Sequence, residues 1–135
     1  MKKLKLKVIT PQKIMYEDEV DAVYSTAVDG EFGVLPGHVP YMTPLAIGIS
    51  KFEKDGKSEY LSTIGGVFQV KDDEVLILTD GAEFGRNIDL PRAIAAKERA
   101  EARLKMKADI NVDRARVALL RALARIQAVS KAKQR

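Results

Sequence analysis

The spacing of apolar residues changes once along the chain, near residue 86, and this change limits the folds that its 135 residues can adopt. Before it, apolar side chains alternate with polar ones, as in the segment Lys3-Leu4-Lys5-Leu6-Lys7-Val8. Alternation with a period of two indicates strands that bury one face. After it, apolar residues recur every three or four positions, as in an amphipathic helix. The sequence therefore predicts an α+β protein, with strands first and helices second.

Turn signals divide the first part into many short strands. Asp55-Gly56 lies between two strand-like runs and is a strong hairpin signal, and Asp72-Asp73 separates a second pair of runs. Gly65-Gly66 predicts a bulge or a close approach of two backbones. Many short strands separated by turns indicate a β-sandwich or flattened barrel, and we expect about ten strands before residue 86.

Two helices are expected in the second part. Asp89 is suited to cap the first, and Pro91 is tolerated in its first turn. Residues 107–110 form the expected connection, after which Asn111 or Asp113 caps the second helix. The apolar stripes that should face each other are Ala93, Ala96, Ala100 and Leu104 in the first helix, and Ala115, Leu119, Ala122, Ile126 and Val129 in the second. A short link between two such helices predicts an antiparallel hairpin.

Alanine dominates the seam of this hairpin. Burying one methyl group contributes about 0.8 kcal/mol, whereas burying a Leu or Ile side chain contributes about 1.5 to 3 kcal/mol. The pair should therefore be only marginally stable alone, so that a ligand or partner could shift it between docked and extended forms. Periodicity leaves a second possibility open, in which the helices stay permanently packed on the sheet.

Composition also separates the two parts. Residues 1–86 carry 10 basic and 14 acidic side chains, whereas residues 87–135 carry 13 basic and 5 acidic ones. The second part also lacks glycine and aromatic residues. This shift predicts two domains, residues 1–86 and residues 87–135.

Several kinds of protein are excluded by what the chain contains. It has no cysteine and a single histidine, His38, so disulfides, thiolate chemistry and His/Cys metal sites are not expected. No apolar run approaches the roughly 20 residues of a transmembrane helix, and the basic N-terminus alternates lysine with apolar residues, unlike a signal peptide. The carboxylates of residues 17–21 and 72–74 fit solvated turns and sheet edges. We therefore expect a cytoplasmic protein with no catalytic site, in which His38 has a structural or interface role.

One group of residues is suited to binding an anion. Offsets of three and seven residues place Asp89, Arg92 and Arg99 on one face of the first helix. Arg121 and Arg125 lie one turn apart on the second, so an antiparallel hairpin could gather four guanidiniums around one phosphate-bearing ligand. The residues leave an alternative open, which is a capping aspartate beside ordinary, solvated arginines.

A sharply shaped loop carries the clearest family resemblance. Residues 29–45 read DGEFGVLPGHVPYMTPL, with three glycines and three prolines, and Leu35-Pro36-Gly37-His38 predicts a turn. This segment closely resembles that of the epsilon subunits of bacterial F-type ATP synthases. The resemblance continues along essentially the whole chain, including the two-helix C-terminus.

The resemblance implies a regulatory ATP site. Residues 88–99 match the pattern I-D-x-x-R-A-x-x-x-x-x-R by which some bacterial epsilon subunits bind ATP, and every motif position is occupied. By this resemblance, the residues that face the base and ribose are Glu83, Ile88, Asp89, Leu90 and Ala93. Those that face the phosphates are Arg92, Arg99, Arg121 and Arg125. The sequence leaves open whether Mg²⁺ accompanies the nucleotide.

The resemblance also implies a function and partners. The chain would be a non-catalytic rotor subunit of the central stalk of a proton-translocating F-type ATP synthase, peripheral on the cytoplasmic face of the cell membrane. Glu31 and His38, at the loop end of the sandwich, would contact the membrane c-ring and the gamma subunit. The extended hairpin would restrain ATP hydrolysis by reaching acidic segments of the catalytic beta and alpha subunits. The residues suited to this contact are Arg114, Arg116, Arg121, Arg125, Lys131 and Lys133.

Two alternatives from other classes are weaker. A nucleic-acid-binding module would use the basic helices, but residues 85–135 have no aromatic side chain for base stacking, and acidic residues are interleaved with the arginines. A β-sandwich enzyme would act through paired carboxylates, but the sequence has no pocket signature for it. We expect no nucleic acid partner and no direct insertion into the membrane.

Overall fold

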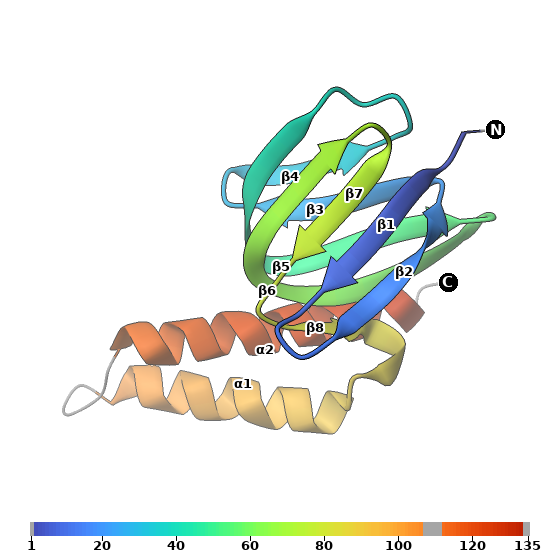
Figure 1. The fold of residues 1–135 in the computed structure, drawn as a ribbon. Helices are drawn as coiled ribbons and strands as arrows, with labels where there is room; N and C mark the ends of the chain where they lie inside the picture. Colours follow the sequence, from blue (N-terminus) through green and yellow to red (C-terminus); the bar gives the residue numbers. More distant parts are fainter. Residues whose placement is uncertain (1, 107–111, 134–135) are drawn as a thin grey trace.

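A computed structural model describes residues 2–106 and 112–133, and it has eight strands followed by helices (Figure 1). The strands are β1 (Leu4–Ile9), β2 (Ile14–Val20), β3 (Ala22–Ala27), β4 (Gly30–Val34), β5 (Tyr41–Lys54), β6 (Lys57–Lys71), β7 (Glu74–Leu78) and β8 (Ala82–Phe84). They are joined in the order β2-β1-β7-β6-β5-β3-β4, with β8 paired to β6. The α+β class, with a β-sandwich followed by two helices, is confirmed.

The long strand β6 takes part in both layers of the sandwich. Its first half pairs with β8 and its second half with β7, while β5 pairs along its whole length. The bend lies at Gly65-Gly66, where both residues have positive φ. A Cβ on Gly66 would lie 1.9 Å from the carbonyl oxygen of Leu78, so the predicted close approach is confirmed. Because β5 and β6 bend without breaking, the described residues form eight strands, and the expected number of about ten was too high.

Both predicted hairpin turns are present. Asp55 and Gly56 have φ of +52° and +80° and join β5 to β6, while Asp72 and Asp73 have φ of +52° and +62° and join β6 to β7. Positive φ at both central residues gives the twist that two-residue hairpins need. The alternation in β1 is confirmed as well, because Leu4, Leu6 and Val8 are fully buried in the core of the sandwich.

A short 3-10 helix, η1 (Gly85–Asn87), links the sandwich to α1 (Leu90–Lys105) and α2 (Val112–Lys133). The capping prediction for α1 is confirmed, since the Asp89 carboxylate accepts a hydrogen bond of 3.1 Å from the backbone N–H of Arg92. For α2, the sequence predicted either Asn111 or Asp113 as the N-terminal cap. Asn111 lies outside the described residues, and Asp113 lies within the first turn of the helix, 3.8 Å from the guanidinium of Arg116.

Helix α2 lies between α1 and the sandwich (Figure 1). It contacts α1 on one side and β5, β6 and η1 on the other. Of the predicted stripe, Ala115, Ala122 and Val129 are buried and Leu119 and Ile126 are half-buried, and Ala124 and Ala128 are buried in addition. A Cβ on Gly85 would lie 2.4 Å from the carbonyl oxygen of Ala128, so the chain needs glycine at this point of closest approach. Among the described residues, neither helix has the length and apolar content that crossing a membrane requires.

Candidate functional site

A cavity of about 420 Å³ lies where the sandwich, the start of α1 and helix α2 meet. Glu83 comes from β8, three residues come from η1 and the cap of α1, and Arg125 reaches in from α2. The lining residues are Glu83, Asn87, Ile88, Asp89, Arg92, Ala93, Ala96, Arg99 and Arg125. Because Arg125 of α2 belongs to the lining, the docked position of the hairpin contributes to this cavity.

Seven of the nine residues predicted to bind ATP line this cavity. The other two are Leu90, the half-buried first residue of α1, and Arg121, which is exposed on α2. Asn87 and Ala96 line the cavity without having been predicted to do so. Ala96 lies one turn after Ala93 on the same helical face, so helical spacing could have identified it. Asn87 precedes the motif and carries no such signal.

The cavity contains more positive than negative side chains. Three arginines and two carboxylates line it. The Nε atom of Arg125 donates to Oε1 of Glu83 at 2.7 Å, and both side chains are partly exposed. Within the described residues, the guanidiniums of Arg92 and Arg99 have no ion pair. Such an arrangement can accept a ligand with several phosphate oxygens.

An apolar surface accompanies these charges. Ile88, Ala93 and Ala96 line the cavity beside the arginines, and Ala93 is 4% exposed. Ligand sites typically combine apolar walls with a few placed polar groups, in volumes of roughly 300 to 1,000 Å³. The cavity therefore has both apolar and cationic side chains in its lining.

His38 lies in the loop between β4 and β5. The predicted turn at residues 35–38 is confirmed, since the backbone N–H of His38 donates to the carbonyl of Leu35 at 3.2 Å. Its ring lies 6.1 Å from that of Tyr41, which lies 5.7 Å from Phe32. Phe32 in turn packs edge-on against the fully buried Phe68. Ring contacts therefore connect His38 to the core. Glu31 precedes Phe32 in β4 and is exposed.

The cationic residues predicted to contact the beta subunits lie along α2. Arg114, Arg116, Lys131 and Lys133 are all exposed. Arg125 is half-buried and Arg121 is exposed, so only Arg125 of this pair is turned into the cavity. The docked helix thus presents most of its positive charge to solvent.

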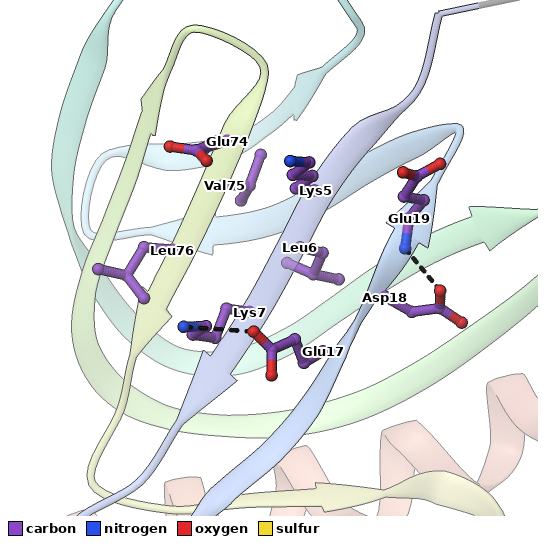
Figure 2. A pocket seen from close by; sticks show the side chains of 9 residues that line it. All are labelled: Lys5, Leu6, Lys7, Glu17, Asp18, Glu19, Glu74, Val75 and Leu76. Atoms are coloured by element: carbon purple, nitrogen blue, oxygen red, sulfur yellow. Dashed lines mark hydrogen bonds and ion pairs between the residues drawn. The ribbon is translucent and has the colours of Figure 1, made fainter.

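A second hollow, of about 520 Å³, lies over β2, β1 and β7 (Figure 2). Lysines of β1 face acidic residues of the neighbouring strands, and Lys7 Nζ lies 3.3 Å from Glu17 Oε2. At its edge, Lys54 and the N–H of Glu19 hold the pKa of Asp18 below its usual value. In the described part of the chain, no group of three or more His, Asp or Glu residues could hold a metal ion. This hollow combines apolar side chains with exposed charges of both signs on neighbouring strands.

Comparison with known proteins places the chain in a family. The family model described as "ATP synthase, Delta/Epsilon chain, beta-sandwich domain" matches residues 3–85. A second, "ATP synthase, Delta/Epsilon chain, long alpha-helix domain", matches residues 86–130. Together they span nearly the whole chain.

Close relatives carry the same description. The "ATP synthase epsilon chain" of Desulfitobacterium hafniense is 44% identical, over 91% of this chain and 93% of its own length. That of Bacillus licheniformis is 42% identical, over 93% and 97%. That of Citrifermentans bemidjiense is 44% identical, over 98% of both.

Solved structures agree with the family. A chain in the cryo-EM structure of Euglena gracilis mitochondrial ATP synthase, OSCP/F1/c-ring in rotational state 1, superposes with a TM-score of 0.82 at 26% identity. The match covers 96% of this chain and 81% of that one. A chain of the Tetrahymena thermophila mitochondrial ATP synthase central stalk and c-ring has a TM-score of 0.59 at 14% identity, over 97% and 96%, and shares the fold. The chain therefore belongs to the delta/epsilon chain family of ATP synthase and is an epsilon subunit.

Proposed function

We propose that this epsilon subunit is a non-catalytic part of the rotor, which joins the catalytic head to the membrane ring and restrains ATP hydrolysis through its helical hairpin. Residues 1–86 bind the gamma subunit and the c-ring, with Glu31 and His38 at the ring-facing end. Residues 87–135 form the regulatory unit. The complex lies on the cytoplasmic face of the membrane, and this chain attaches to it peripherally, without inserting into the bilayer.

The observation that carries the regulatory part is the cavity between hairpin and sandwich. Its apolar side chains at Ile88 and Ala93 suit the base of ATP, and the carboxylates of Asp89 and Glu83 suit the ribose hydroxyls. Arg92, Arg99 and Arg125 suit the phosphates, and Arg121 lies one turn away on α2. ATP with or without Mg²⁺ would fit this set of donors, because guanidiniums bind phosphate oxygens directly.

Ligand binding at this place has a direct consequence for conformation. Because Arg125 of α2 belongs to the lining and Glu83 comes from the sandwich, ATP would bind the docked hairpin more tightly than the extended one. A ligand stabilises the conformation that it binds, so ATP would favour the docked, non-inhibitory state.

The extended state would act through charge. The hairpin half has a net charge of +8, with 13 basic and 5 acidic residues. Once released, the cationic face of α2 would contact acidic segments of the catalytic beta and alpha subunits. Release would then place the basic side chains where they oppose rotation in the hydrolytic direction.

Reconstitution tests the proposal. The wild-type chain or a fragment ending at Arg86 is added to a complex of the same enzyme that lacks this subunit. Both should co-purify with gamma and the catalytic hexamer, and only the full chain should lower ATP hydrolysis. Failure of the full chain to co-purify, or equal hydrolysis with chain and fragment, would contradict the proposal.

A further inference from the structure

One side chain ties the loop that carries His38 to a distant turn. The N–H of Gly37 donates to Oδ1 of Asp73 at 2.7 Å, across 36 residues of sequence. The carbonyl of the same aspartate accepts from the N–H of Lys5 at 2.8 Å. In Figure 1 the loop after β4 and the turn between β6 and β7 lie at the end of the sandwich away from the helices. Asp73 therefore joins three segments at this end.

Besides the ring contact between His38 and Tyr41, few interactions attach the loop to the rest of the sandwich. Within residues 35–40, the hydrogen bonds found among the described residues are local ones, such as His38 to Leu35, apart from the bond between Gly37 and Asp73. Gly37 has φ of +88°, a backbone conformation that residues with a Cβ atom rarely adopt. The carboxylate thus holds the loop at its most unusual backbone position.

The same loop presents an exposed apolar surface. Leu35 is 58% exposed and Val39 is 70% exposed, and Met42, just beyond the loop, is 63% exposed. Their arrangement depends on the path of the backbone between Pro36 and Pro40. A contact that fixes Gly37 therefore fixes the relative positions of His38 and these apolar side chains.

Asp73 is suited to this task in two ways. It occupies a left-handed backbone conformation, with φ of +62°, which aspartate, asparagine and glycine tolerate better than other residues. Its charged oxygen accepts a stronger hydrogen bond than a neutral one would. Asp72 has the same backbone conformation, with φ of +52°, but its side chain is exposed and bonds to no loop residue in the described part of the chain. The two neighbours therefore form a matched pair for experiment.

We propose that Asp73 is a positioning residue, whose carboxylate holds the loop of residues 35–40 in the shape that the membrane ring recognises. The proposal rests on the proposed function, in which this end of the sandwich faces the ring. Asp73 acts through Gly37 and does not itself need to touch the ring.

Three variants separate the carboxylate from its backbone conformation. Asp73→Gly keeps the positive φ but removes the acceptor, whereas Asp73→Asn keeps both the conformation and an acceptor oxygen. Asp72→Gly makes the same chemical change at the neighbouring turn position, without affecting Gly37. All three are made in the full-length chain.

Two measurements are made on each variant. Amide hydrogen exchange by NMR follows the Gly37 N–H directly, and binding to a detergent-solubilised complex of gamma with the c-ring follows recognition. Asp73→Gly should speed exchange and weaken binding by about tenfold each, as loss of a charge-assisted hydrogen bond implies. Asp73→Asn should stay within about threefold of wild type, and Asp72→Gly should match wild type in both measurements.

The outcomes distinguish the role of Asp73 from the proposed function, which is binding of the subunit to gamma and the ring. If the wild-type chain does not bind the gamma–ring complex, the proposed function itself is overturned, and the role of Asp73 with it. If wild type binds and Asp73→Gly binds equally well, only the role of Asp73 is overturned. The same holds if Asp73→Gly weakens binding while the Gly37 N–H exchanges as slowly as in wild type, since the carboxylate would then not act through Gly37.

Discussion

Arg125 of α2 donates through Nε to Oε1 of Glu83 on β8, at 2.7 Å, and this ion pair joins the hairpin to the sandwich inside the candidate ATP site. Both partners are partly exposed, so solvent screens the pair and its contribution to docking is modest. A phosphate bound near Arg125 would replace Glu83 as its partner. In the proposed function, bound ATP would therefore add to the contacts that hold the hairpin docked.

The first prediction concerns Arg92, which lines the cavity and has no ion pair among the described residues. Arg92→Ala should raise the dissociation constant for ATP at least about tenfold, because one charge-assisted contact contributes about 1.5 to 3 kcal/mol. Isothermal titration calorimetry on the isolated chain measures this. Arg103→Ala is the control, since Arg103 is exposed on the same helix outside the cavity. Equal affinities for the two variants would remove Arg92 from the site.

The second prediction concerns Gly85, which packs closely against helix α2. Gly85→Ala would place a Cβ 2.4 Å from the carbonyl oxygen of Ala128, and backbone at that distance cannot simply rotate away. Helix α2 should therefore undock more often, with faster amide exchange in α2 and weaker ATP binding.

Gly81→Ala is the matched control, because its nearest atom would be the side chain of Ile64 at 3.5 Å, an ordinary contact. Normal exchange in α2 of the Gly85 variant would show that docking does not depend on this approach.

The third prediction concerns Ser62, whose hydroxyl is buried without a hydrogen-bond partner in the described structure. It lies opposite Ile49 of β5 and Glu83 of β8, on the sheet face that α2 covers. A buried, unsatisfied polar group costs about 1 to 3 kcal/mol, so Ser62→Ala should raise the free energy of unfolding by about 1 kcal/mol. Chemical denaturation of the full chain measures the change.

Ser50→Ala makes the same chemical change with the opposite expected sign. The Ser50 hydroxyl is paired with those of Ser25 and Thr63, at 2.8 and 3.2 Å, and removing it leaves those groups incompletely satisfied. If both alanine variants lower the free energy of unfolding, the Ser62 hydroxyl does not destabilise the fold as we infer.

Sequence patterns predicted local structure well, because the relevant interactions are local. The turns at Asp55-Gly56 and Asp72-Asp73 follow from backbone preference, and the cap at Asp89 follows from a side chain three residues before its donor. Seven of nine predicted site residues were brought together because most of them lie close in sequence or one helical turn apart.

The features that the sequence did not predict depend on how α2 packs between α1 and the sandwich. The predicted stripe describes one face of α2, but Ala124 and Ala128 are buried as well, because α2 packs against both α1 and the sandwich. Alanine is common on both buried and exposed helical surfaces, so its presence carries no signal. The same packing buries Ser62, which the alternation in β6 would predict to be exposed. It also directs Arg125, but not Arg121, into the cavity.

The fourth prediction concerns the charge of α2. Neutralising its exposed basic residues should raise ATP hydrolysis by the assembled complex at modest ionic strength, where screening is weak. The residues are Arg114, Arg116, Lys131 and Lys133, each changed to Gln. Exposed lysines of the sandwich serve as the control, namely Lys13, Lys57 and Lys71. Hydrolysis that stays as low as wild type would exclude electrostatic restraint by this helix.

The central claim, that ATP holds the hairpin docked and thereby relieves inhibition, has one most direct test. The chain has no cysteine, so Lys57→Cys on the sandwich and Lys105→Cys at the end of α1 can carry a fluorescent donor and acceptor. In the assembled complex, energy transfer and hydrolysis are measured together while the ATP concentration is varied, with Arg92→Ala as the binding-deficient reference. The account predicts that ATP shifts the transfer efficiency to that of the isolated, docked chain, with the same midpoint as the loss of inhibition, and that Arg92→Ala moves both midpoints to higher ATP. A transfer efficiency that does not change while ATP is bound would contradict it.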